Sequence, residues 1–151
     1  MVWQIDGYGG AGPLRFGMSP PEVEGIMGTH PVIKRSPPNA ARYLFGPDRP
    51  VVIFEQNSLV EISFSLDASE PVKYGSEDLF LSSEKDVLEM LWAHSGRADT
   101  FEVAGFIVFL PLGITLTGFH DHDADQKAIS CFVRGRWDRF GTRMKPIEFS
   151  S

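Results

Sequence analysis

The chain matches itself when it is shifted by 64 residues, and this internal repeat constrains its fold more than any other feature. The matching positions pair Phe16 with Phe80, Ser19 with Ser83, Glu22 with Asp86, Val23 with Val87, Ile26 with Met90, Met27 with Leu91, and Phe45 with Phe109. Self-similarity at a fixed offset indicates that one supersecondary unit occurs twice. The sequence therefore predicts a single domain over residues 1–151, made of two diverged copies at about 1–70 and 71–151.

Both copies contain the start signal of a helix. Ser19 and Ser83 stand at the N-cap position, and a carboxylate follows each of them three residues later, as in a capping box. Apolar residues then recur at spacings of three and four, which gives each helix one buried stripe. We expect Gly28 to end the first helix and the second helix to run to about His94.

Three runs rich in β-branched and aromatic residues follow each helix signal and predict strands. They span 42–45, 51–55 and 58–65 in the first copy and 106–110, 113–119 and 127–134 in the second. The last run of each copy alternates apolar and polar residues, so that Val60, Ile62 and Phe64 are expected to face one way. Such alternation is typical of a sheet with one face buried and the other in water.

The predicted fold class is α+β, with two tandem repeats of a short helix followed by a three- to four-stranded antiparallel β-meander. The helices are expected to pack on one face of the strands. The sequence leaves open whether the two meanders form one sheet or two.

The single cysteine, Cys131, excludes an internal disulfide and favours a reducing compartment. The N-terminus lacks a basic segment followed by a long apolar one, and Gly105, Pro111 and Gly113 interrupt the most apolar stretch, 104–119. We therefore expect no signal peptide, no membrane span and cytoplasmic localisation.

The net charge of −6 is unevenly distributed along the chain. Residues 1–133 carry −9, whereas residues 134–151 carry +3. Negative charge repels phosphate backbones and favours cationic partners, so nucleic acid is not expected as a partner. The segment 134–140 does interleave cations with aromatics, as single-stranded nucleic-acid binders do. Pairing of these arginines with acidic loops of the same chain is the favoured interpretation.

The two copies differ most in the loop between their second and third strands. The first copy turns tightly at residues 56–57, whereas the second inserts histidines and aspartates, namely His120, Asp121, His122, Asp123 and Asp125. Imidazole and carboxylate groups suit divalent metals, but the spacing does not match an EF-hand. A solvated acidic loop is the favoured interpretation, with partner recognition next. No metal and no cofactor is predicted.

No catalytic signature is present in the sequence. Residues 7–12 fit the string G-x-G-x-x-G, but Pro13 follows and the helix cap comes only at Ser19, so we expect a flexible loop rather than a dinucleotide site. The four histidines stand near no Ser or Cys in a nucleophile context. We predict no catalytic residue and expect that the protein is not an enzyme.

The segments LRFGMSPPEV (14–23) and YGSEDLFLSSEKDV (74–87) resemble those of small bacterial proteins of uncharacterised families. Some of these look like immunity proteins encoded beside secreted antibacterial toxins. The helix-plus-meander duplication is similar to the β-lactamase-inhibitor-protein-like architecture, in which tandem units present a sheet surface to a target protein. The expected lack of a signal peptide and of disulfides differs from a secreted inhibitor and fits a cytoplasmic immunity protein.

These patterns favour a protein-binding inhibitor, specifically a cytoplasmic immunity protein that neutralises a cognate toxin with a basic surface. The protein would act as a monomer or homodimer. The expected partner-binding residues are His120, Asp121, His122, Asp123 and Asp125, with Arg136 and Trp137 as anchors. The alternative is a non-catalytic accessory protein that binds a small ligand or a metal.

Overall fold

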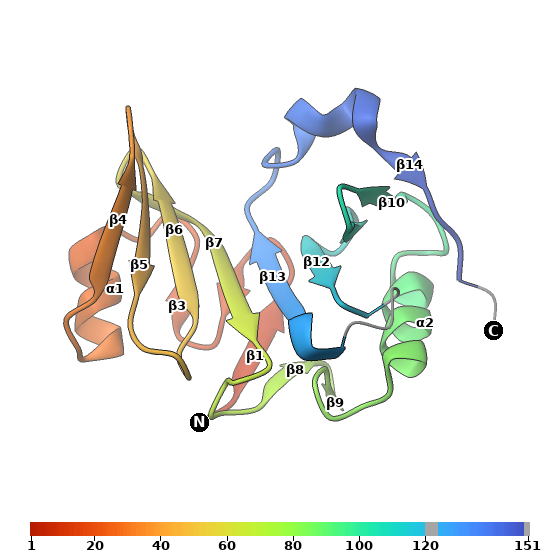
Figure 1. The fold of residues 1–151 in the computed structure, drawn as a ribbon, viewed down its shortest axis with the longest axis horizontal. Helices are drawn as coiled ribbons and strands as arrows, with labels where there is room; N and C mark the ends of the chain where they lie inside the picture. Colours follow the sequence, from red (N-terminus) through yellow and green to blue (C-terminus); the bar gives the residue numbers. More distant parts are fainter. Residues whose placement is uncertain (120–123, 150–151) are drawn as a thin grey trace.

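The computed structural model describes residues 1–119 and 124–149, and these form an α+β fold. The helices are α1 (Pro20–Met27) and α2 (Glu84–His94), with two short 3-10 helices, η1 (Ala124–Gln126) and η2 (Asp138–Arg143). The strands form two β-sheets (Figure 1). Within the described ranges, no helix combines the length and the apolar character needed to cross a membrane.

The larger sheet is antiparallel and has nine strands in the order β14-β10-β11-β12-β13-β7-β6-β5-β4. Their bounds are β4 (Val32–Ser36), β5 (Ala40–Leu44), β6 (Val51–Glu55), β7 (Ser58–Ser65), β10 (Thr100–Val103), β11 (Phe106–Phe109), β12 (Ile114–Thr117), β13 (Ala128–Phe132) and β14 (Lys145–Pro146). Strands β7 and β13 pair with each other along five residues each. The two meanders therefore form one continuous sheet, which answers the question that the sequence left open.

The smaller sheet has five short strands in the order β3-β2-β1-β8-β9. They are β1 (Trp3–Asp6), β2 (Gly10–Ala11), β3 (Leu14–Arg15), β8 (Val72–Tyr74) and β9 (Glu77–Asp78). Parallel pairing of β1 with β8 brings together the segments that precede the two helices. Strands of two to four residues are too short to show periodicity, so the sequence did not predict this sheet.

Residues 7–9 form a turn and residues 10–11 form strand β2, so part of the segment that was expected to be a loop is a strand. A Cβ at Gly7 would lie 2.1 Å from the carbonyl oxygen of Leu112, so the backbone needs glycine at this close approach. The glycines of the G-x-G-x-x-G string therefore serve packing and turns, in keeping with the exclusion of a dinucleotide site.

Both predicted helix starts are confirmed. The Ser19 hydroxyl accepts a hydrogen bond from the Glu22 backbone N–H at 3.4 Å, and the Glu22 carboxylate accepts one from the Ser19 N–H at 3.2 Å. Ser83 likewise caps α2 through the Asp86 N–H at 3.2 Å. Gly28 ends α1 with a left-handed φ of 72°, as predicted.

The strand predictions hold with the observed bounds for β6 and β7, and within two residues at each end for β5, β11, β12 and β13. They fail in two respects. Strands β4 and β10 were not predicted, because β4 is exposed along its whole length and the buried residues of β10, Thr100 and Val103, do not alternate with exposed ones. The orientation of Val60 was also wrong. A bulge shifts the register so that Phe54 opposes Leu59 while Ile53 opposes Glu61, and Leu59 rather than Val60 takes the buried position.

Both helices and the smaller sheet pack on the same face of the nine-stranded sheet, here called the inner face. One continuous core joins residues from all of them, including Val23 of α1, Leu91 of α2, Ile5 of β1, Phe54 of β6 and Ile114 of β12. Figure 1 shows α1 and α2 at opposite ends of the molecule, with β1 and β8 between them. In element order, α1 precedes the antiparallel strands β4–β7, and α2 precedes β10–β13.

The opposite face, here called the outer face, differs between the two halves of the sheet. In the second half a separate cluster of Val103, Val108 and Phe132 lies beneath residues of the C-terminal segment, including Trp137 and Phe140. Strand β13 is consequently buried on both faces, which corrects the expectation of one wet face for this half. In the first half, strands β4 and β5 keep exposed residues on the outer face.

Candidate docking site at edge strand β4

Of the expected interface residues, the structure describes Asp125, Arg136 and Trp137, and Asp125 lies apart from the other two. His120, Asp121, His122 and Asp123 lie outside the described residues. Asp125 is exposed in η1, at one end of β13, whereas the segment that carries Arg136 and Trp137 leaves the other end of that strand (Figure 1). Asp125 and the two proposed anchors therefore belong to different regions of the surface.

Arg136 is engaged within the chain. Its Nε lies 2.7 Å from Glu61 Oε1 and its Nη1 lies 2.8 Å from Glu55 Oε1, and the side chain is only 13% exposed. The expected intramolecular pairing is thus found for this arginine, although its carboxylate partners lie on β6 and β7 rather than in loops. Arg136 fastens the C-terminal segment to the outer face of the sheet.

Trp137 lies in an aromatic cluster that covers the second half of the outer face. Its ring centroid is 5.0 Å from that of Phe140, 5.6 Å from that of Phe106 and 6.2 Å from that of Phe132. The indole is half-buried, and its Nε1 has no hydrogen-bond partner among the described residues. Much of its surface is therefore committed to packing within the molecule.

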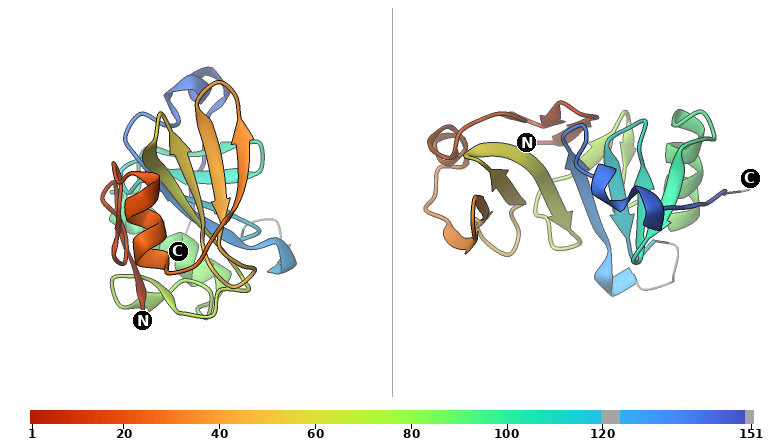
Figure 2. Two further views of the ribbon diagram at one scale, coloured as in Figure 1. Left: turned by 90° about the vertical axis from the view of Figure 1, so that its left-hand side faces the viewer. Right: turned by 90° about the horizontal axis from the view of Figure 1, so that it is seen from above.

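Strand β4 is the longest edge strand among the described residues. It pairs with β5 through all five of its residues, and no other described strand pairs with its far side. Every residue of β4 is exposed, including Val32 at 63% and Ile33 at 39%. The left view of Figure 2 shows the molecule from this side. Unpaired backbone N–H and C=O groups along an edge are a template for another strand.

Free positive charge gathers at this edge. Lys34 of β4 is the cross-strand partner of Arg42 on β5, so two like charges stand opposite each other on the outer face. Arg35, the next residue along β4, projects to the inner side. None of the three forms an ion pair within the described part of the chain. Residues 29–50 contain four Lys or Arg and one Asp, a net +3, in a chain of net −6.

A groove lies on the outer side of this edge, with a cavity volume of about 530 Å³. Its lining is mainly aliphatic and small, with two cations: Val32, Lys34, Leu44, Gly46, Pro47, Arg49, Val51, Ser63, Phe64, Ser65 and Ala128. Arg49 is held in place because its Nη2 donates to the Met27 carbonyl at 3.2 Å. The groove therefore suits an aliphatic side chain next to an anionic group.

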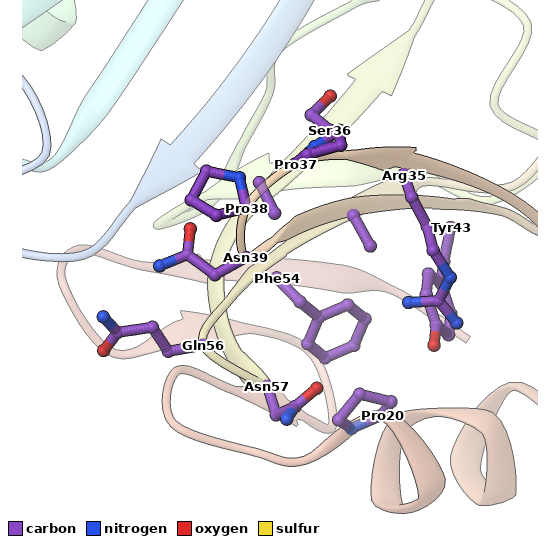
Figure 3. Close-up of a pocket in the computed structure, with 12 residues that line it drawn as sticks. Pro20, Arg35, Ser36, Pro37, Pro38, Asn39, Tyr43, Phe54, Gln56 and Asn57 are labelled. Atoms are coloured by element: carbon purple, nitrogen blue, oxygen red, sulfur yellow. The ribbon is translucent and has the colours of Figure 1, made fainter.

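A second pocket, of about 280 Å³, lies at the far end of β4 and opens toward α1. Figure 3 shows Arg35 and Tyr43 on one side of it, Asn57 and Pro20 below, and the Phe54 ring in the middle. The remaining lining residues are Ser36, Pro37, Pro38, Asn39, Ala40, Ala41 and Gln56. No Asp or Glu lines it, so Arg35 presents a positive charge among neutral hydrogen-bonding groups.

The sequence contains a signal for this site outside the repeated positions. Val32-Ile33 followed by Lys34-Arg35 stands between Pro31 and Pro37, which delimit a five-residue extended segment. Alternation of apolar and polar residues is absent, and all five residues of β4 are exposed, so the strand has no buried face. Lys34, Arg35 and Arg42 are evident in the sequence, but they lie at one edge only because β4 pairs with β5.

Ionisable groups elsewhere in the described residues are weaker candidates for a functional site. Within the described ranges, no group of three or more His, Cys, Asp or Glu side chains is placed to hold a metal ion. The Cys131 thiol is fully buried, and this burial raises its pKa far above the usual value of a thiol. Such a thiol is poorly nucleophilic in the native state.

Comparisons with protein-family models, with curated proteins and with solved structures give no match for this chain.

Proposed function

We propose that the protein is a protein-binding inhibitor that engages its partner through the edge strand β4 and the two flanking pockets. The observation that carries this proposal is the combination, on one strand, of a backbone edge and cations that have no partner among the described residues, and an exposed apolar end. Strand addition at a sheet edge is a recurrent way to bind a protein, in which backbone hydrogen bonds provide affinity and side-chain pockets provide specificity.

In its specific form, the proposal is a cytoplasmic immunity protein that neutralises a cognate antibacterial toxin. The resemblance of residues 14–23 and 74–87 to immunity-type proteins motivates this form. A tandem duplication is part of the same proposal, and it is supported by the order of one helix followed by four antiparallel strands in each half. The β4 edge directs the search for the contact surface to the first half.

The test is co-purification of the chain with the product of the gene beside its own. A stoichiometric complex that suppresses the toxicity of that product would support the proposal. Absence of both binding and protection would contradict it.

Two surface variants then locate the interface. Lys34→Glu combined with Arg35→Glu changes the β4 edge, and Asp121→Lys, Asp123→Lys and Asp125→Lys together change the acidic loop. Lys85→Glu combined with Arg143→Glu is the matched control, because both residues are exposed and form no ion pair in the described structure. We expect only the β4 variant to lose the complex. Loss in the loop variant alone would move the interface to the loop.

The pocket of Figure 3 supports a second candidate function, the binding of a small ligand with a carboxylate group. Arg35 is the only charged residue in its lining. A thermal-shift screen with small dicarboxylates, repeated with Arg35→Gln and with Arg97→Gln as control, tests this alternative. Stabilisation that disappears only in Arg35→Gln would favour it.

A further inference from the structure

We infer that strand β4 accepts an extended acidic segment of the partner protein as a tenth strand of the large sheet. This inference rests on the proposed function, and it names the chemistry of the partner: two adjacent carboxylates flanked by aliphatic residues. It differs from the expectation of a basic partner surface, which followed from the net charge of the whole chain.

The structure already contains a strand added at its other end. Strand β10 follows α2 as β4 follows α1, and its free side is paired with β14, through Phe101 with Pro146 and Glu102 with Lys145. The Ile147 N–H extends this pairing to the Thr100 carbonyl at 3.0 Å. No described segment does the same for β4. Within the described residues, the sheet is thus extended by the chain's own β14 at one end and by no strand at the β4 end.

The charges on β4 select the kind of strand that fits. Like charges directly opposite each other in a sheet are destabilising, so Lys34 beside Arg42 is a pair that an incoming anion would relieve. Cationic side chains on an edge also oppose pairing with an identical strand. A second copy of β4 would bring two further cations, and an acidic strand is therefore the better occupant.

Alternation along the added strand distributes its side chains between the two pockets. Successive residues of a strand point to opposite faces, so two adjacent carboxylates would lie beside Lys34 on the outer side and Arg35 on the inner side. The next two residues would lie beside Val32, at the outer groove, and Ile33. Aliphatic side chains suit both positions.

Single-stranded nucleic acid is the other polyanion that this edge would have to distinguish. Binding of that kind normally includes stacking of bases on exposed aromatic rings. The outer groove contains only one aromatic residue, Phe64, which is 1% exposed, and its other apolar lining residues are not aromatic. The observations therefore favour a protein segment.

The test uses capped synthetic peptides and the intact chain. The probe is Thr-Val-Val-Glu-Glu-Val-Val-Thr, whose symmetrical pattern presents the carboxylates in either strand direction. The first control replaces both glutamates by lysine. The second, Thr-Val-Pro-Glu-Glu-Pro-Val-Thr, keeps the charge but cannot pair as a regular strand. A dT oligonucleotide serves as the nucleic-acid arm. Binding is followed by fluorescence polarisation and by the amide NMR shifts of β4.

We expect the acidic peptide to bind with amide shifts along β4, and both control peptides and the oligonucleotide to bind at least about tenfold more weakly. Lys34→Glu with Arg35→Glu should weaken binding of the acidic peptide by at least about tenfold. Lys34→Gln with Arg35→Gln provides the same comparison if the reversal impairs folding. Lys85→Glu with Arg143→Glu should leave the affinity for the acidic peptide unchanged.

Equal binding of the proline peptide or of the oligonucleotide would overturn the inference, because attraction of charge alone would then explain it. No binding of the acidic peptide would overturn it as well. If that failure occurred while the chain still captured the neighbouring gene product, the proposed function would stand without strand addition. If the peptide bound but the gene product did not, strand addition would stand and the toxin-inhibitor proposal would fail.

Discussion

Arg136 shows how one residue connects distant parts of this chain. It joins the C-terminal segment to Glu61, 75 positions earlier, and to Glu55, 81 positions earlier. Without the guanidinium, two carboxylates would stand close together on the outer face with no counter-charge. Removing one partner of a shielded charge pair costs more than the pair itself contributes, because the remaining charge stays poorly solvated.

Arg136→Met keeps most of the aliphatic part of the side chain and removes the guanidinium. We expect it to lower the free energy of unfolding by about 2 kcal/mol. Urea denaturation at pH 7 measures this change. Arg143→Met, at an exposed position, should stay within about 0.5 kcal/mol of the wild type. Equal effects of the two substitutions would contradict a stabilising role for the Glu55–Arg136–Glu61 contacts.

Tyr8 makes stability depend on pH. Its hydroxyl donates a hydrogen bond to the Leu110 carbonyl, and the Arg134 guanidinium lies 4.1 Å from the centre of its ring. Burial raises the pKa of this phenol above its usual value of 10.0; the charge of Arg134 acts in the opposite direction, and Asp138 adds to the rise. The folded state therefore holds the phenolic proton more tightly than the unfolded state. The contribution of the Tyr8 phenol to the free energy of unfolding is complete below pH 10 and is lost as the pH rises through its pKa in the folded state.

We expect Tyr8→Phe to cost about 1 kcal/mol at pH 7, because the Leu110 carbonyl loses its donor. The difference in unfolding free energy between wild type and Tyr8→Phe should shrink as the pH rises above 10. Urea denaturation at pH 7 and at pH 11 provides the comparison. A difference that stayed constant or grew with pH would show that Tyr8 does not titrate as described.

The two helices are stabilised by hydrogen bonds at their N-termini. Each is short, at eight and eleven residues, and each begins with a serine that accepts a backbone N–H. We expect Ser83→Ala to lower the free energy of unfolding by about 1 kcal/mol, since one N–H of the first turn then lacks its partner. Thermal or urea denaturation measures the loss. Ser76→Ala, in the exposed turn between β8 and β9, should have almost no effect.

The strands show where local pattern stops being informative. Strands β6 and β7 were predicted with their observed bounds, because the turn at Gln56 and Asn57 punctuates two long runs of strand-forming residues. The side of β7 on which Val60 lies was predicted wrongly. A bulge depends on how two strands pair, and the sequence of neither strand indicates it clearly. Strand β4 was not predicted because its residues are exposed on both sides.

At the scale of the whole molecule, one core passes through both meanders. Phe64 of β7 is 1% exposed and lies beside Trp3 of the smaller sheet, with ring centroids 5.5 Å apart. Strand β7 also pairs with β13, where the Ser130 hydroxyl donates to the Ser63 hydroxyl at 3.0 Å. A substitution in β7 at the junction with β13 is therefore expected to destabilise both halves of the sheet.

We expect Phe64→Ala to lower the free energy of unfolding by about 3–5 kcal/mol and to leave a single unfolding transition. Far-UV circular dichroism reports on the sheets and helices, and tryptophan fluorescence reports on Trp3, Trp92 and Trp137. The two signals should change together in wild type and variant. Two separate transitions would indicate that the halves unfold independently.

The sequence by itself determined the features that are decided within a few residues. Ser19 and Ser83 cap their helices because a hydroxyl reaches an N–H three positions away, whatever the rest of the chain does. The α+β class followed in the same way from short apolar patterns. Tertiary structure alone decided that β10 is covered by β14, that Arg136 meets Glu55 and Glu61, and that β4 remains open. These pairings join residues 43 to 81 positions apart, or concern an edge to which no described strand is added, so they depend on how the chain closes on itself rather than on local chemistry.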